Sequence, residues 1–257
     1  MNTQSGRFSS LEVNQDSQKT GQSRGGAIRD EGYYMKTGYK AELAGDHEAA
    51  LVEYSSALGE NPLFIEAWLA QLWMLLYLGE PSEADMWADR ALNNYPKQPG
   101  LMALKAMALH RCGFIDEARE LNDAALGSER ESADVWLSRG ALHISLDSVA
   151  TSACFKHALA VSVNRPLTTL RIGDIYLFHR QYADAERYLR QATIELPDSA
   201  WVWYEYGLAQ KALGWEDSAM IAFAKAAQLA PLDERYRMAL HNKKRTLMTR
   251  LRSLFNR

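Results

Sequence analysis

The chain has 257 residues, of which 47% are hydrophobic and 24% are charged, as in an ordinary soluble protein. It contains no run of 18 apolar residues and no apolar signal segment near its start, so we expect neither a membrane-spanning helix nor secretion. Two cysteines outside any CxxC pair argue against a disulfide framework or a structural zinc site and favour a cytoplasmic location. The net charge of −3 argues against a nucleic-acid partner.

Residues 1–30 are rich in Ser, Gln, Gly and Asn and carry few large apolar side chains. Such a segment cannot bury enough surface to offset the entropy that ordering would cost. We therefore expect residues 1–30 to form a disordered N-terminal segment.

From residue 31 onward, one pattern of small and large residues recurs. Pro62 and Pro96 are 34 residues apart, and so are Pro197 and Pro231. Each proline follows an alanine-containing pattern with spacings of 4, 3 and 5 residues. The blocks are Ala50, Tyr54, Ala57 and Pro62; Ala84, Ala88, Ala91 and Pro96; Ala118, Asn122 and Ala125, with Arg130 in the proline position; Ala185, Leu189, Ala192 and Pro197; and Ala219, Phe223, Ala226 and Pro231. A period of this length indicates an array of stacked units.

This pattern resembles the tetratricopeptide repeat (TPR), a helix–turn–helix unit of 34 residues. The resemblance covers residues 31–233 and implies an all-α fold, a right-handed α-solenoid of stacked repeats. The six implied units are 31–64, 65–98, 99–132, 133–165, 166–199 and 200–233. The fourth unit is irregular because Ala158 comes one residue early, and we expect a shortened internal loop near residues 147–148.

Glycine and proline mark the expected helix boundaries. Gly45, Gly79, Gly113 and Gly214 fall between the two helices of a unit, where a left-handed backbone costs glycine little. The prolines end the second helix because a proline ring cannot continue the hydrogen-bond ladder. Helices of about a dozen residues are marginal alone, so they must pack against their neighbours.

The segment 234–257 differs from the repeats in charge. Seven basic and no acidic residues lie between Arg237 and Arg257, which leaves 22 basic and 32 acidic residues elsewhere. Its apolar residues fall near one helical stripe, so we expect a basic helix that caps the last repeat. An alternative is that this helix makes weak contact with an anionic membrane. The basic residues concerned are Lys243, Lys244, Arg245, Arg250 and Arg252.

The sequence shows no phosphate-binding loop, GxSxG or HExxH motif. His110 and Cys112 lie two residues apart, which directs their side chains about 200° from each other on a helix and prevents a shared metal. We therefore expect no enzyme activity, no cofactor and no metal site.

In TPR proteins the first helix of each unit lines a concave groove, and the resemblance implies that its inward positions bind a partner. Many of these positions hold aromatic residues or Met, which are enriched in interface cores. The candidate groove residues are Met35, Tyr39, Leu69, Trp73, Leu76, Tyr77, Met107, His110, Arg111, Leu170, Arg171, Asp174, Phe178, Trp201, Tyr204 and Leu208.

The same side chains could instead pack against the neighbouring unit, since a buried Trp removes about 150–250 Å² from water. Trp73, Tyr77, Trp201 and Tyr204 are compatible with either role. We expect Trp68, Trp136 and Trp203 in the core.

We therefore expect a non-enzymatic protein-interaction module that binds a protein or peptide segment. The family resemblance suggests an adaptor, chaperone or assembly factor of a bacterial secretion, pilus or surface complex. Three alternatives remain: a membrane-peripheral scaffold docked through the basic helix, a regulatory subunit of a separate enzyme, and self-association of the array.

Overall fold

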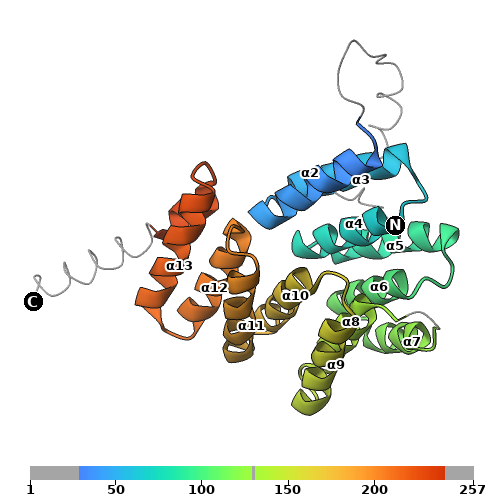
Figure 1. Cartoon of the computed structure of the whole chain (residues 1–257). Helices are drawn as coiled ribbons and strands as arrows, with labels where there is room; N and C mark the ends of the chain where they lie inside the picture. The colour runs from blue at the N-terminus through green and yellow to red at the C-terminus, as the bar shows by residue number, and fades with distance from the viewer. Residues whose placement is uncertain (1–28, 129–130, 241–257) are drawn as a thin grey trace, which may run out of the picture. The chain divides into compact units, whose positions relative to one another are not determined.

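The structure is a computed structural model, and it describes residues 29–128 and 131–240. These residues form the α-helices α2 to α13 and contain no strand. The helices follow one another as hairpins joined by short turns (Figure 1). Their bounds are α2 Glu31–Ala44, α3 His47–Glu60, α4 Ile65–Tyr77, α5 Pro81–Asn94, α6 Pro99–Cys112, α7 Ile115–Leu126, α8 Ala133–His143, α9 Ser148–Val161, α10 Arg165–Phe178, α11 Tyr182–Glu195, α12 Ala200–Ala212 and α13 Glu216–Leu229. Within the described residues, no helix has the length and apolarity needed to cross a membrane.

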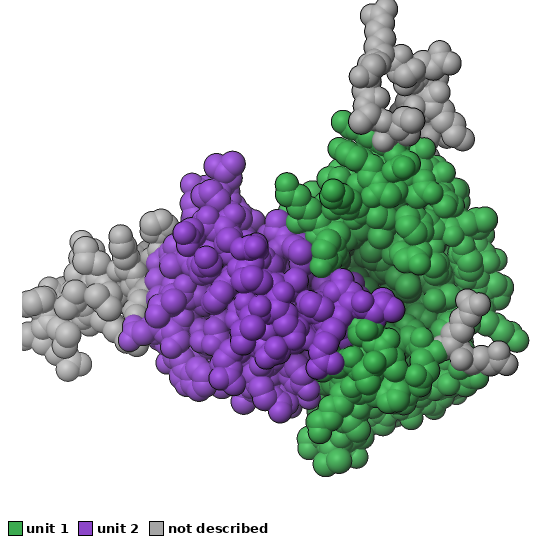
Figure 2. Space-filling view, in the orientation of Figure 1, with its two compact units in different colours: residues 1–42, 46–162 green, residues 43–45, 163–257 purple. Residues whose placement is uncertain are grey.

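The chain divides into two compact units (Figure 2). Unit 1 comprises residues 1–42 and 46–162, which include helices α3 to α9 and most of α2. Unit 2 comprises residues 43–45 and 163–257, which include helices α10 to α13. Each unit is described by itself below.

The expected all-α stack of helical hairpins is confirmed. Each predicted repeat holds one pair of helices, although α10 begins at Arg165, one residue before the fifth predicted block. The irregularity of the fourth repeat lies in helix α8, which has 11 residues where the other first helices have 13 or 14. The prediction of a shortened loop near residues 147–148 was therefore wrong, because the missing length comes out of the helix.

The small residues of the repeat pattern lie where the two helices of a hairpin meet. All eleven alanines in the five blocks are at most 2% exposed. Glycine allows a still closer approach: a Cβ added to Gly140 on α8 would lie 2.2 Å from Cε1 of Phe155 on α9. Gly38 and Tyr54 repeat this arrangement between α2 and α3, where the corresponding distance is 2.6 Å. Side-chain volume on one helix thus fills the space that glycine leaves on the other.

The turns within the hairpins use the left-handed backbone conformation. Gly45, Gly79, Gly113 and Gly214 have φ angles of 78°, 74°, 92° and 80°, as their positions in the sequence predicted. Arg180 occupies the equivalent position in the fifth repeat and has a φ angle of 60°. A side chain in this conformation costs about 1–2 kcal/mol, so the turn before α11 is strained.

The described part of the chain ends in the segment predicted to form a cap. Residues 234–240 are helical, and Tyr236 is 1% exposed among core residues of α12 and α13, including Ala200 and Ala226. This contact covers apolar surface of the last repeat. The basic residues Lys243, Lys244, Arg245, Arg250 and Arg252 lie outside the described residues, as do residues 1–28 of the N-terminal segment.

Candidate functional site

Helices α4, α6 and α8 of unit 1 are linked by two polar contacts among the residues predicted to face inward. The indole Nε1–H of Trp73 on α4 donates to Oδ1 of Asp134 on α8 at 2.9 Å. Nη1 of Arg111 on α6 donates to the carbonyl oxygen of Leu76 on α4 at 2.6 Å. Both contacts join first helices of different repeats, and each fixes the position of a large side chain.

An aromatic row extends from the first of these contacts. The rings of Trp73 and Tyr77 stack with a centroid distance of 5.6 Å and an interplanar angle of 27°. On its other side Tyr77 stacks on His47, the first residue of α3, at 5.0 Å and 23°. The Tyr77 ring is therefore held between two neighbours, one of which is anchored by Asp134. Fixed aromatic rings of this kind suit binding because little side-chain entropy remains to be lost.

The structure separates the predicted residues of unit 1 into two sets. Trp73, Leu76 and Met107 are at most 3% exposed, so they belong to the packed interior and a partner cannot reach them. The expectation that these three side chains face a partner is corrected by their burial. The half-buried set comprises Met35, Tyr39, Leu69, Tyr77, His110 and Arg111.

The predicted residues of unit 2 divide in the same way. Leu170 and Trp201 are at most 2% exposed and serve packing. Tyr204 is half-buried, and its ring lies 5.6 Å from Phe223 and 5.1 Å from Tyr236, so it also belongs to the core of the last repeat. Phe178, by contrast, is 56% exposed. Arg171, Asp174 and Leu208 are half-buried.

Of the three tryptophans expected in the core, Trp68 is buried at 4% exposure. Its Nε1–H donates to the carbonyl oxygen of Pro62 at 2.9 Å. Trp136 and Trp203 are only half-buried. Trp136 packs on the His157 ring at 4.1 Å, so one of its faces is covered by a polar ring rather than by the hydrophobic core.

Two residues of the inner face were missed by the sequence analysis. His47 lies on the second helix of its repeat, and only first helices were considered. Asp134 is 9% exposed in the first turn of α8, where an acidic residue also stabilises the helix N-terminus. That local role gave no signal of its hydrogen bond to a tryptophan 61 residues earlier in the chain.

One carboxyl group in unit 2 has a strongly shifted pKa. Burial raises the pKa of Glu205 on α12 to about 7, against the opposing effects of the Trp201 indole N–H and of Arg235. The Trp201 Nε1–H donates to Oε1 of Glu205 at 3.2 Å. Among the described residues, no cluster of three or more His, Cys, Asp or Glu side chains is arranged to hold a metal ion.

No protein-family model matches the chain, and no curated protein matches its sequence. Solved structures with a similar fold include a tetratricopeptide repeat protein from Parabacteroides merdae, which is 16% identical, covers 90% of this chain and 89% of its own, and gives a TM-score of 0.49. PilW, a type IV pilus biogenesis factor, is 19% identical over 82% of this chain and 98% of its own, with a TM-score of 0.47. YrrB, a TPR protein with an unusual peptide-binding site, is 18% identical over 74% of this chain and 97% of its own, with a TM-score of 0.42.

These similarities concern the fold. The chain is a run of helical-hairpin repeats of the tetratricopeptide type, with the period and the glycine turns described above.

Proposed function

We propose that the chain is a non-catalytic protein-interaction module and that unit 1 binds a peptide segment of a partner protein. The proposed binding surface consists of the half-buried inward residues Met35, Tyr39, Leu69, Tyr77 and Arg111. The observation that supports it most strongly is the stacking of Tyr77 between His47 and Trp73. A partly exposed aromatic ring fixed on both sides is a suitable anchor for a partner side chain.

The surface is mostly apolar, with one cation at one end. Met35, Tyr39, Leu69 and Tyr77 would contact apolar side chains, while the guanidinium of Arg111 has further N–H groups besides the one bound to Leu76. A segment with alternating apolar residues and an acidic or carbonyl acceptor would match this composition. In unit 2, Phe178 and Arg171 are the inward residues that would extend such a surface.

The test is capture of a partner by the full chain, followed by titration calorimetry with the captured protein. Tyr77→Ala should weaken binding at least tenfold, since truncation of an interface hot spot costs about 2 kcal/mol or more. Phe114→Ala is a matched control, because Phe114 is also aromatic, is 53% exposed and is not among the inward residues. Circular dichroism of both variants checks that the fold is retained.

Equal loss of binding in both variants, or none in either, would reject the proposed surface. The finer proposal, an adaptor, chaperone or assembly factor, is supported by the repeat architecture alone. Its test is the identity of the captured protein: a secretion or pilus component supports it, and a stoichiometric enzyme supports a regulatory subunit instead.

A further inference from the structure

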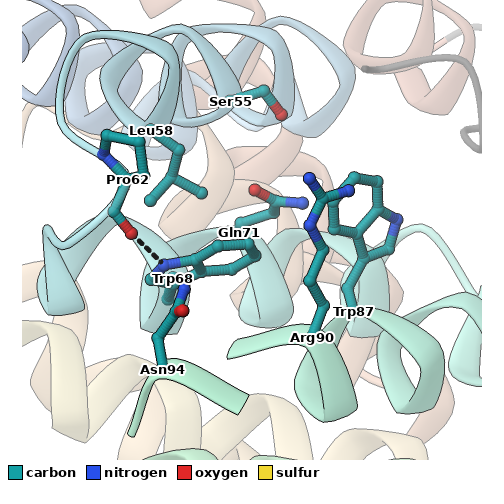
Figure 3. A pocket seen from close by; sticks show the side chains of 8 residues that line it. All are labelled: Ser55, Leu58, Pro62, Trp68, Gln71, Trp87, Arg90 and Asn94. Atoms are coloured by element: carbon teal, nitrogen blue, oxygen red, sulfur yellow. Dashed lines mark hydrogen bonds between the residues drawn. The ribbon is translucent and has the colours of Figure 1, made fainter. Parts of the chain in front are cut away.

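Unit 1 contains a pocket on the side of α4 away from the proposed binding surface. It has a volume of about 110 Å³ and lies among α3, α4 and α5 (Figure 3). Gln71, which lines it, lies about 160° around helix α4 from Trp73, given 100° per residue. The lining residues are Ser55, Leu58, Pro62, Trp68, Gln71, Trp87, Arg90 and Asn94.

The amide group of Gln71 lacks a partner within the described protein. Gln71 is 1% exposed, and neither Nε2 nor Oε1 hydrogen-bonds to another group of the described residues. The hydroxyl of Ser55, on the facing helix α3, is likewise buried without such a partner. Figure 3 shows the Gln71 amide between the Trp68 ring and the Arg90 guanidinium. Native proteins rarely leave buried polar groups unpaired, so this pair indicates a ligand.

Other repeats show what the same positions normally do. The equivalents of Gln71 two and one repeats later are Arg139 and Lys105, and each forms an ion pair with the preceding second helix. Arg139 pairs with Asp123 on α7 at 2.5 Å, and Lys105 pairs with Asp89 on α5. Asp89 and Asp123 occupy the position that Ser55 holds on α3. The first interface between repeats therefore lacks the carboxylate that the next two contain.

The rest of the pocket favours a carboxylate as well. None of its lining residues is acidic, whereas Ser55, Gln71, Arg90 and Asn94 all carry hydrogen-bond donors. The guanidinium of Arg90 lies 5.2 Å from the centroid of the Trp87 ring, which holds its planar fork beside the pocket. The rings of Trp68 and Trp87, 6.2 Å apart, provide apolar walls for a methylene group.

We propose that this pocket binds the side-chain carboxylate of an aspartate or glutamate from a partner protein. The carboxylate takes the place that Asp89 and Asp123 fill in the following repeats and bonds to Gln71 and Arg90. The volume is several times what a single water needs, which accommodates a carboxyl group and its methylene. The site is independent of the surface around Tyr77, so the two proposals can fail separately.

The probe is N-acetyl-glutamate amide, titrated into the full chain while the indole N–H signals of Trp68 and Trp87 are followed by NMR. We expect saturable shifts with a Kd on the order of millimolar, as for other ligands of a few atoms. The uncharged analogue N-acetyl-glutamine amide should bind at least tenfold more weakly. Equal binding of the two analogues would overturn the carboxylate assignment. Acetate binding as tightly as the glutamate probe would overturn the assignment to a protein side chain.

Three variants test the residues. Ser55→Asp supplies the carboxylate from α3 itself, so it should abolish probe binding and raise Tm. Arg90→Met, at an exposed position, should weaken the probe at least tenfold and leave Tm nearly unchanged. Arg119→Met is the matched control, since Arg119 on α7 pairs with Asp116 outside the pocket and its loss should not affect the probe.

Three results would overturn the proposal. One is probe binding that is equal in wild type and Arg90→Met. Another is a Ser55→Asp variant that folds less stably than wild type, because an internal carboxylate should fit this site. The third is a crystal structure soaked with the probe in which the pocket holds only water around Gln71.

Discussion

Substituting Gly140 by Ala tests the closest packing contact in unit 1. In an unobstructed helix interior this change stabilises by about 1 kcal/mol, because alanine favours the helix. At Gly140 the new methyl group would lie 2.2 Å from Cε1 and 2.7 Å from Cδ1 of Phe155. Phe155 is fully buried, so its ring has no solvent-filled space into which it can move.

The expected sign is therefore destabilising. Overpacking of a core costs about 1–3 kcal/mol, and this contact is short enough to require a shift of the ring or of a helix. After the gain in helix propensity is subtracted, Gly140→Ala should cost about 1–2 kcal/mol. At about 2–4 °C per kcal/mol, Tm should fall by about 2–8 °C in thermal unfolding followed by circular dichroism.

Two further variants separate packing from backbone effects. Gly32→Ala makes the same change where the nearest listed type of contact is ordinary, a 3.4 Å approach to Asp30 Oδ1, and should leave Tm unchanged or higher. In Gly140→Ala combined with Phe155→Leu, the smaller side chain should relieve part of the clash, giving a coupling energy of about 1 kcal/mol. If Gly140→Ala raises Tm as Gly32→Ala does, the packing argument is refuted.

Three other predictions concern single side chains. Trp73→Phe should cost about 2–3 kcal/mol in urea unfolding, because it removes the hydrogen bond to the Asp134 carboxylate and part of a buried ring. Arg180→Gly should stabilise by about 0.5–1 kcal/mol, since glycine relieves the left-handed strain but is more flexible when unfolded; Gly214→Arg should do the reverse. Glu205→Gln should remove a loss of stability between about pH 4.5 and 7, and should stabilise by at most about 3 kcal/mol at pH 8.

Each of these has a result that contradicts it. Trp215→Phe, at a residue 50% exposed, is the control for Trp73→Phe, and equal costs would show that the hydrogen bond contributes nothing. For Arg180→Gly the contrary result is a lower Tm. For Glu205 the raised pKa means that the folded protein holds a proton more tightly than the unfolded chain, so stability must fall as pH rises through this window. Parallel stability–pH curves for wild type and Glu205→Gln would contradict the burial of that carboxyl.

The features that repeat along the chain were predictable from sequence. A period of 34 residues identified the buried alanines and the glycine turns, because each position experiences the same surroundings in every repeat. The fourth repeat shows the limit of this argument. A one-residue deletion is visible in the spacing of Ala158, but the spacing does not tell whether a helix or a loop is shortened.

The inward residues were predicted less well, because one position serves packing in one repeat and remains accessible in another. Trp73 and Tyr77 are separated by one helical turn, yet Trp73 is 1% exposed and Tyr77 is half-buried. The difference depends on Asp134, which approaches Trp73 from α8. Such a contact joins residues with unrelated positions in their repeats, and periodicity carries no information about it.

The pocket around Gln71 lies between these cases. Its unpaired amide is a property of the three-dimensional structure, but the missing acid is already present in the sequence as Ser55 in a position held by Asp89 and Asp123. In a repeat protein the same interface is built several times, so a departure at one copy is measured against the others in the same chain. Where such a departure leaves buried donors without their usual acceptor, loss of stability is the expected cost. A partner that supplies the acceptor would recover that stability on binding, which links the irregular position to function.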